Sequence, residues 1–342
     1  MDQKQCKPNY HFTQVDGQKA IDALGKEEAL RALREMMRIR NFELRGAQAY
    51  QMGKVWGFYH EYTGQEAIQT AAVHACGGKK NLWVTTYRCH GLALLLGMTV
   101  KEGMCELYGK ANGNAQGRGG SMHLYADNMY GGNGIVGGQW PIGAGLAFSL
   151  KYREIKDQVA ICFGGDGSVM MGTFGESMNL AALWNLPLIA VIENNQYSMG
   201  TAQERGVANL PIGENVAKAY GVNSYTVDGM DFGNCLAVFK EVSDYVKKTS
   251  RPAIIEALTY RFKGHSISDA GHYRTKEEVE LNKARDSIQI LADSIKSRKW
   301  ASDEEIEGMN KECKEEVLEA MKVADESPWP DPNSLGEGVF FG

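Results

Sequence analysis

Two apolar runs, each followed by a polar turn, constrain the fold of this chain more than any other feature. Residues 159–163 (VAICF) lead into GGDGSVMMG, and residues 186–193 (LPLIAVIE) lead into Asn194 and Asn195. The segment between them, TFGESMNLAALWN, has helical spacing, whereas the runs themselves have the length of strands. A strand, a helix and a second strand in this order form a right-handed parallel unit, which brings the carboxyl ends of both strands to one edge. The sequence therefore predicts that Asp166 and Asn195 lie close together.

The same alternation continues on both sides of this unit. Residues 144–153 have a helical pattern, and residues 223–229 and 252–262 read as strands. Strands that alternate with helices are typical of an α/β fold with a doubly wound parallel sheet flanked by helices. We predict this fold class.

Helical extensions are expected at both ends. Residues 26–50 carry an apolar stripe at helical spacing, and the charged segment after Thr275 carries an apolar edge. We predict an N-terminal lead-in over 1–25, an α/β domain over 26–275 and a C-terminal helical extension with a Pro-rich tail over 276–342. The stripe consists of Leu30, Leu33, Met37 and Leu44, and the edge of Ile306, Met309, Cys313, Val317 and Met321.

Composition excludes several functional classes. The net charge of −5 leaves no basic excess for a phosphate backbone, so we expect no nucleic-acid partner. No run approaches the eighteen apolar residues of a membrane span, so we expect no membrane partner. Seven cysteines without a CxxC pair indicate reduced thiols in the core. The first twenty residues resemble neither a signal peptide nor an Arg-rich transit peptide, so we expect a bacterial-type cytoplasmic protein.

Two glycine motifs could form a cofactor loop. Residues 132–137 match the dinucleotide pattern GxGxxG, but that motif needs a preceding strand, and LYADNMYG (124–131) is a poor one. Asp157 also precedes the strand at 159–163, whereas a ribose-binding carboxylate should follow a strand. We therefore disfavour nicotinamide or flavin binding at this motif.

The second motif, around Asp166, has the expected surroundings. Gly164, Gly165 and Gly167 let the backbone turn tightly and approach a ligand. Mg²⁺ prefers oxygen ligands, which an Asp, an Asn, a main-chain carbonyl and a diphosphate would supply. Two ordinary turns at strand ends are the alternative. The order and the separation of about thirty residues favour a metal–diphosphate site.

These segments resemble a known family. GDG followed by NN is similar to the thiamine-diphosphate motif, and the flanking sequence resembles alpha subunits of 2-oxoacid dehydrogenase decarboxylases, most closely the pyruvate type. The likeness extends from Arg34 to about Val339 and includes GFYHEYTGQEA, TTYRCHG, GRGGSMH, YGGNGIVGGQWPIGAG and YRFKGHSISD. YSMGT after the Asn pair is more similar to pyruvate enzymes than to branched-chain or acetoin enzymes.

The resemblance implies a role for each matching residue. Thiamine diphosphate and Mg²⁺ would be the cofactors, with the metal held by Asp166, Asn195 and the carbonyl of Tyr197. The phosphate oxygens would be bound by Tyr87, Arg88 and the backbone of Gly167 and Ser168, and the aminopyrimidine by the backbone of Gly134 and Val136.

Two histidines are the catalytic candidates that the resemblance implies. His265 would anchor the diphosphate or move protons at the mouth of the site, and His60 lies in another matching segment. The loop 261–275 has no apolar periodicity, so we expect it to order when an anion binds Arg261, His265 or Arg274.

The resemblance also implies partner proteins, because one group that the reaction needs is missing from this sequence. Activation of thiamine diphosphate requires a carboxylate beside the aminopyrimidine, and in this family that Glu comes from a separate beta subunit. The resemblance thus implies a site at an interface, in an assembly of two alpha and two beta chains. A 2-oxoacid, pyruvate, would be the substrate, and a lipoyl-bearing dihydrolipoyl acyltransferase would receive the acyl group.

Alternatives remain open because the chain departs from the family pattern. Met170 and Met171 stand where a polar residue is common, Trp140 replaces a smaller aliphatic residue, and SDAG replaces SDP. The alternatives are the alpha subunit of a branched-chain 2-oxoacid or acetoin dehydrogenase, and a non-catalytic scaffold chain with the same fold.

Overall fold

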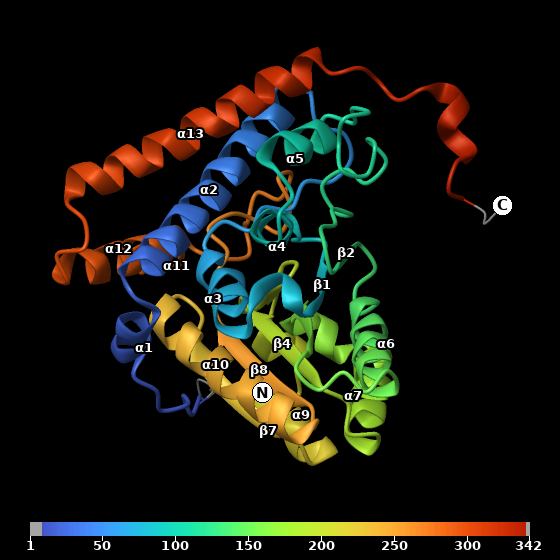
Figure 1. The fold of residues 1–342 in the computed structure, drawn as a ribbon, viewed down its shortest axis with the longest axis vertical. Coiled ribbons are helices and arrows are strands. Elements are labelled where there is room, and N and C mark those ends of the chain that lie inside the picture. Colours follow the sequence, from blue (N-terminus) through green and yellow to red (C-terminus); the bar gives the residue numbers. More distant parts are fainter. Residues whose placement is uncertain (1–8, 340–342) are drawn as a thin grey trace.

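A six-stranded parallel sheet forms the centre of the molecule (Figure 1). The computed structural model describes residues 9–339. The strand order is β2-β1-β3-β4-β8-β7, and every neighbouring pair is parallel. The predicted fold class is therefore confirmed. The strands are β1 (Leu82–Thr86), β2 (Met129–Asn133), β3 (Ala160–Gly165), β4 (Leu188–Asn194), β7 (Asn223–Asp228) and β8 (Ala253–Leu258).

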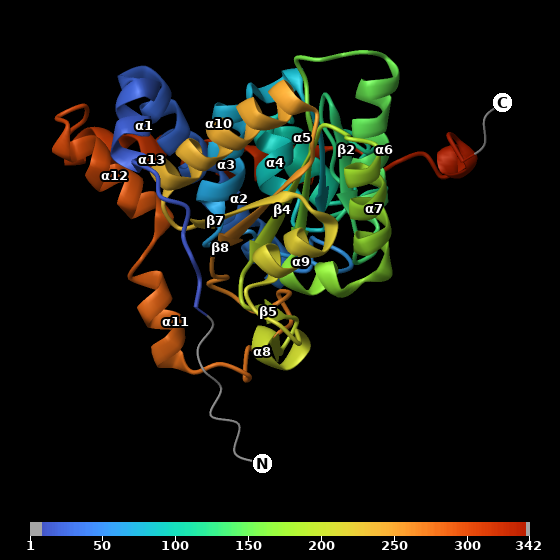
Figure 2. The same cartoon turned by 90° about the horizontal axis from the view of Figure 1, so that it is seen from below.

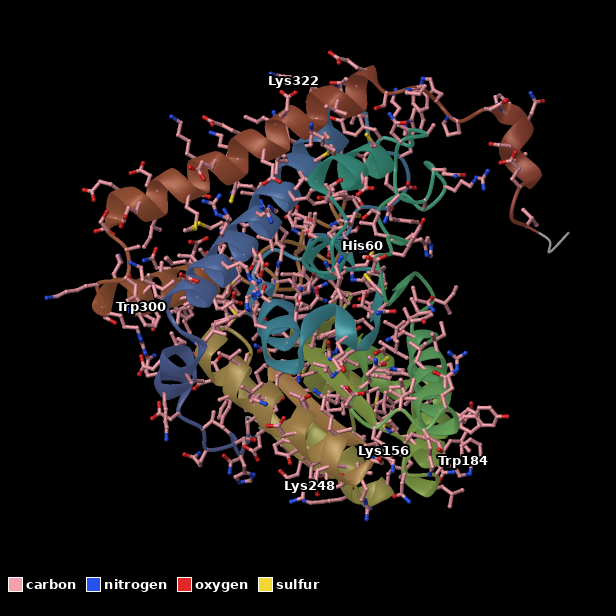
Figure 3. The ribbon with its side chains drawn as sticks, in the orientation of Figure 1. His60, Lys156, Trp184, Lys248, Trp300 and Lys322 are labelled. Atoms are coloured by element: carbon pink, nitrogen blue, oxygen red, sulfur yellow. The ribbon has the colours of Figure 1, made fainter. Side chains whose placement is uncertain are left out.

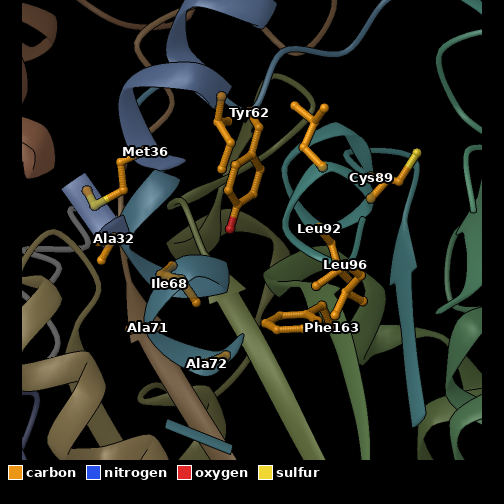
Figure 4. Packing of buried hydrophobic residues seen from close by; sticks show 14 of the residues in the cluster. Ala32, Met36, Tyr62, Ile68, Ala71, Ala72, Cys89, Leu92, Leu96 and Phe163 are labelled. Carbon is orange, nitrogen blue, oxygen red and sulfur yellow. The ribbon is translucent and has the colours of Figure 1, made fainter. Parts of the chain in front are cut away.

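Helices cover both faces of the sheet, so the central strands are buried on both sides. Alternate side chains of β3 and β4 enter different cores: Ile161, Phe163 and Ile189 pack in one, and Ala160, Cys162 and Leu188 in the other. Figure 4 shows part of the first core, where Phe163 lies beside Leu92 and Leu96. The first face carries α2 (Lys26–Gln51), α3 (Glu66–Cys76), α4 (His90–Leu95), α5 (Val100–Leu107) and α10 (Phe232–Thr249), and the second α6 (Gln139–Tyr152), α7 (Gly172–Leu183) and α9 (Ile212–Tyr220).

The chain leaves β1 and β3 in opposite directions. These strands are neighbours, with Leu82 paired to Ala160. The segment after β1 enters α4 on the first face, whereas the segment after β3 enters α7 on the second. Divergent connections leave a crevice at the carboxyl ends of two parallel strands, the usual ligand position in doubly wound sheets.

Strand β2 corrects one step of the sequence reasoning. The structure places a strand at Met129–Asn133, leading into the GxGxxG motif, and α6 follows the motif. The segment is a strand despite its composition because it pairs in parallel with β1, through an irregular register. Asp157 nevertheless forms an ion pair with Lys80 on the surface before β3, so it does not occupy the position of a ribose-binding carboxylate.

Further helices lie at both ends of the chain. The helix α1 (Gly17–Leu24) packs on α10, and α13 (Asp303–Glu326) packs along α2 and α5 (Figure 1). The segment after α13, including the short helix η3 (Pro332–Gly336), extends away from the sheet (Figure 2). Two more helices, α11 (Lys276–Lys283) and α12 (Ser287–Ser297), connect the sheet to α13.

The apolar edge of α13 is buried at Cys313, Val317 and Met321, whereas Ile306 and Met309 are half-buried. The predicted stripe of α2 is wrong for Leu44, which is 45% exposed. The second half of α2 buries a different face, on which Tyr59 packs so closely that a Cβ atom added to Gly46 would lie 2.2 Å from its hydroxyl. The residues of that face are Phe42, Glu43, Gly46 and Ala49.

The cysteines are buried as predicted. In the described part of the chain all of them are free thiols within the core, and burial raises the pKa of Cys76 and Cys89 to about 12. They are Cys76, Cys89, Cys105, Cys162, Cys235 and Cys313, while Cys6 lies outside the described residues. Among residues 9–339, no helix is long and apolar enough to cross a membrane.

One buried carboxylate organises the glycine-rich loop that follows α5. Glu106, on α5, accepts four backbone N–H groups at 2.6–3.2 Å, and Gly113 is so close that an added Cβ atom would lie 2.2 Å from its Oε2. Consecutive N–H groups that point inward form an anion-binding concavity. The four donors belong to Ala115, Gly117, Gly119 and Gly120.

We therefore expect Glu106→Gln to lower the free energy of unfolding by about 2 kcal/mol, because hydrogen bonds to a charged group are strong and the Gln Nε2 cannot accept. Urea denaturation measures this change. Glu307→Gln, on the exposed face of α13, is the control and should change stability by less than about 0.5 kcal/mol. Equal stabilities for the two variants would contradict the role of Glu106.

Candidate active site

A pocket lies at the carboxyl ends of β1, β3 and β4, where the connections diverge. It brings together nearly all of the predicted site residues, which come from five separate segments. Those that line it are Tyr87, Arg88, Val136, Asp166, Gly167, Ser168, Asn195, Tyr197 and His265. Of the predicted residues, Gly134 and His60 do not line the pocket: Gly134 lies against the ring of His123, and His60 lies behind Tyr87 and His265.

Asp166 is a buried carboxylate without a cationic partner. It is 2% exposed, accepts a hydrogen bond from Ser198 Oγ at 3.0 Å, and forms no ion pair with any described residue. Burial raises its pKa, and the Ser198 hydroxyl and the charge of Arg261 oppose that shift. A carboxylate that has lost its hydration in this way favours a bound cation.

The turn around Asp166 is held by a small hairpin, β5 (Tyr197–Ser198) and β6 (Thr201–Ala202). A Cβ atom at Gly167 would lie 2.2 Å from Ser198 Oγ, so only glycine lets the hairpin pack on the turn. Ser198 was not predicted from the sequence, because its contribution depends on this contact between segments 32 residues apart.

Asn195 reaches the same pocket from the adjacent strand. The pairing of Gly165 with Glu193 places the two strand ends side by side, as the sequence predicted. The Asn195 amide donates to Gln65 Oε1 at 3.4 Å, while its Oδ1 accepts only a long bond, 3.4 Å, from Tyr197 N. The phenol of Tyr197 donates to Glu278 on α11 at 2.8 Å, so a metal contact from this residue has to come from its main-chain carbonyl.

Two buried arginines also line the pocket. Arg88 is 4% exposed and donates to main-chain carbonyls, at 2.6 Å in the case of His265. Arg261 is 2% exposed and donates to the carbonyl of Met199 at 3.0 Å and to Tyr273 Oη at 3.3 Å. Neither forms an ion pair with a carboxylate of residues 9–339. Buried guanidinium groups without a carboxylate are suited to bind an anionic ligand.

The predicted histidines form one cluster beside these arginines. The ring centroids of His60 and His265 are 4.9 Å apart, and the ring of Tyr87 lies 4.5 Å from that of His60. Figure 3 shows His60 in the interior of the molecule. Burial, and then the charge of Arg88, lower the pKa of His265 to about 3 and that of His60 to about 4. Both rings are therefore neutral at pH 7.

Gln139 also lines the pocket and was not predicted. It is the first residue of α6 and is buried, and neither atom of its amide has a partner among the described residues. No sequence pattern distinguishes it. A buried amide without partners is costly, so ligand atoms or water are expected to contact it.

The structure accommodates Trp140, one of the departures from the family pattern. Its Nε1 donates to the carbonyl of Ser168 at 3.2 Å, and its ring packs on Gly164, where an added Cβ atom would be 2.1 Å away. Met171 packs on Gly137 in the same region, while Met170 and Met171 remain about half exposed and do not line the pocket. These substitutions leave the pocket intact.

The loop 261–275 is closed by hydrogen bonds around Asp269. Its carboxylate accepts from the backbone N–H groups of His265 and Gly271 at 2.6 and 2.8 Å, and from the hydroxyl of Tyr273 at 2.8 Å. Arg274 donates to main-chain carbonyls and does not line the pocket. Of the three residues expected to meet an anion, the structure places Arg261 and His265 in the pocket.

The chain is similar to known proteins over nearly its whole length. The family model "Dehydrogenase E1 component" matches residues 34–333. The chain is 41% identical to the pyruvate dehydrogenase E1 component subunit alpha of Rickettsia felis, over 92% of this chain and 96% of the relative. It is 39% identical to the subunit of the same name from Rhizobium meliloti, over 94% and 92% of the two chains. It is 41% identical to a probable mitochondrial subunit of this kind from Caenorhabditis elegans, over 93% and 79%. With this extent of similarity over nearly its whole length, the chain belongs to the dehydrogenase E1 component family.

Proposed function

We propose that the chain is the alpha subunit of a pyruvate dehydrogenase decarboxylating component that uses thiamine diphosphate and Mg²⁺. One observation carries the proposal: a buried carboxylate without a cation and two buried arginines without carboxylates, among the described residues, line the same pocket. A magnesium diphosphate carries a charge complementary to each of these groups.

The residues of the pocket fit these cofactors. Asp166, the amide oxygen of Asn195 and the carbonyl of Tyr197 are hard oxygen donors and would hold Mg²⁺. Tyr87, Arg88, the backbone of Gly167 and Ser168, and His265 would bind the diphosphate, while the backbone of Gly134 and Val136 would meet the aminopyrimidine. When bound, thiamine diphosphate would supply the nucleophilic carbon and the electron sink that the decarboxylation of a 2-oxoacid requires.

A partner is required for a specific reason. Of the described residues, those that line the pocket include a single carboxylate, Asp166, and the metal would use it. The carboxylate that protonates the aminopyrimidine therefore has to come from another chain. We propose a beta subunit as its source, in a cytoplasmic assembly of two alpha and two beta chains. A lipoyl-bearing dihydrolipoyl acyltransferase would receive the acyl group.

The pocket argues against the scaffold alternative. A chain that serves only as a scaffold has no need to bury an unpaired Asp166 and two unpaired guanidinium groups, since each such group costs stability. Met170 and Met171, which prompted that alternative, lie outside the pocket lining. The choice among pyruvate, branched-chain oxoacids and acetoin is open to direct assay.

The metal role of Asp166 predicts opposite effects on binding and stability. Asp166→Asn should weaken Mg²⁺-dependent binding of thiamine diphosphate at least about 100-fold, because the charged ligand is lost. The same change should leave the cofactor-free chain equally stable or more stable, because a desolvated charge is removed. Calorimetry and urea denaturation measure the two effects.

Asp157→Asn is the matched control, since Asp157 is an exposed surface carboxylate. It should leave cofactor affinity unchanged. Binding by Asp166→Asn as tight as that of the unmodified chain would remove Asp166 from the metal site.

Catalysis should depend on the second chain. We expect the alpha chain alone to release no CO₂ from pyruvate, and the alpha–beta pair to do so, with pyruvate preferred over branched-chain oxoacids and acetoin. Product formation by each reconstituted pair, with an artificial electron acceptor, tests this. Turnover by the alpha chain alone would contradict the shared site, and cofactor binding without turnover of any substrate would support the scaffold alternative.

A further inference from the structure

The contacts of Arg261 determine which nitrogen of His265 carries its proton. Arg261 Nη1 lies 3.2 Å from His265 Nδ1. A guanidinium group has five N–H donors and no acceptor, and it stays protonated in proteins. The ring nitrogen that faces it must therefore accept. In a neutral imidazole the other nitrogen, Nε2, then carries the proton.

The neighbouring histidine has the opposite arrangement. His60 Nδ1 lies 3.0 Å from the main-chain oxygen of His265, which can only accept. The proton of a neutral His60 is therefore on Nδ1, and its Nε2 has a free lone pair. His265 therefore presents an N–H donor at its Nε2, and the adjacent His60 presents an acceptor at its Nε2.

Arg261 is itself held in place on several sides. Besides the ring, it donates to the carbonyl of Met199 at 3.0 Å and to Tyr273 Oη at 3.3 Å. Tyr273 in turn donates to Asp269 at 2.8 Å, and Asp269 accepts from the backbone N–H of His265 at 2.6 Å. The ring and the guanidinium group therefore belong to one hydrogen-bonded unit.

We propose that Arg261 is a positioning residue that fixes His265 as an Nε2–H donor to an anionic ligand in the pocket. The identity of that ligand, the cofactor diphosphate, rests on the function proposed above, whereas the choice of tautomer does not. His265 lines the pocket, and its Nδ1 is occupied by Arg261, so Nε2 is the nitrogen available to a ligand. A neutral N–H donor binds phosphate oxygens without having to gain a proton.

Nitrogen NMR of the full chain tests the tautomer directly. With ¹⁵N-labelled histidine, a protonated ring nitrogen and one with a lone pair give well-separated signals, and His265→Gln assigns those of His265. We expect a protonated Nε2 and an unprotonated Nδ1 at pH 7. A protonated Nδ1, or a mixture of tautomers, in the unmodified chain would overturn the proposal.

Three variants separate positioning from general loop folding. Arg261→Met keeps the apolar stem but removes every donor, so His265 should become a mixture of tautomers. Arg261→Lys keeps a group that only donates and should restore the single tautomer. Arg274→Gln is the matched control, because Arg274 holds the same loop through the carbonyls of Arg261 and Lys263 and does not touch the ring.

The single tautomer should persist in Arg274→Gln. Its loss in that control as well, or its persistence in Arg261→Met, would show that Arg261 has no specific role. If Arg261→Met does not fold, the unmodified chain and Arg261→Lys still decide the question.

Cofactor binding gives the second readout. In the alpha–beta pair, Arg261→Met should weaken binding of thiamine diphosphate with Mg²⁺ by roughly tenfold or more, and Arg274→Gln by much less, because one charge-assisted hydrogen-bonding unit is lost. Equal affinity of the two variants would overturn the link to the ligand. If the unmodified pair itself binds no thiamine diphosphate, the proposed function fails while the tautomer result stands independently.

Discussion

The divergence of the chain after β1 and β3 is the constraint on which the rest of the site depends. Because these neighbouring strands send their connections to opposite faces, a crevice forms at their carboxyl ends, where residues from five segments meet. The same geometry explains why glycine occupies the closest approaches. Gly164 leaves space for Trp140, and Gly167 leaves space for Ser198. Both side chains therefore pack directly on the backbone turn around Asp166.

The charged groups of this crevice form no ion pairs with other described residues. Asp166, Arg88 and Arg261 all line it, and in the described residues each contacts hydroxyl or carbonyl groups and forms no ion pair with an opposite charge. Desolvation without pairing is unfavourable in the isolated protein, and it becomes favourable once a ligand supplies both charges. The two neutral histidines add hydrogen bonds without adding net charge.

The sequence predicted the position of a residue correctly where the order of strands and helices along the chain determines that position. The order strand, helix, strand was enough to bring Asp166 and Asn195 together, because handed crossovers leave little choice. It did not find β2, since a segment such as MYGGN becomes a strand only through its neighbour β1. It did not find Ser198 or Gln139 either, because their roles arise from contacts across the fold. The prediction that Leu44 belongs to the buried stripe of α2 was wrong, because this long helix buries different faces along its length.

The loop after α5 is held in part by a side chain that lies outside the loop. Glu106 contacts the backbone N–H groups of that loop, and every polypeptide position except proline carries such a group. These four contacts therefore do not depend on the side chains of the donor residues, except that Gly113 leaves the space that the carboxylate occupies. A change of Glu106 would thus remove four contacts of the loop at once, although Glu106 itself belongs to a different element.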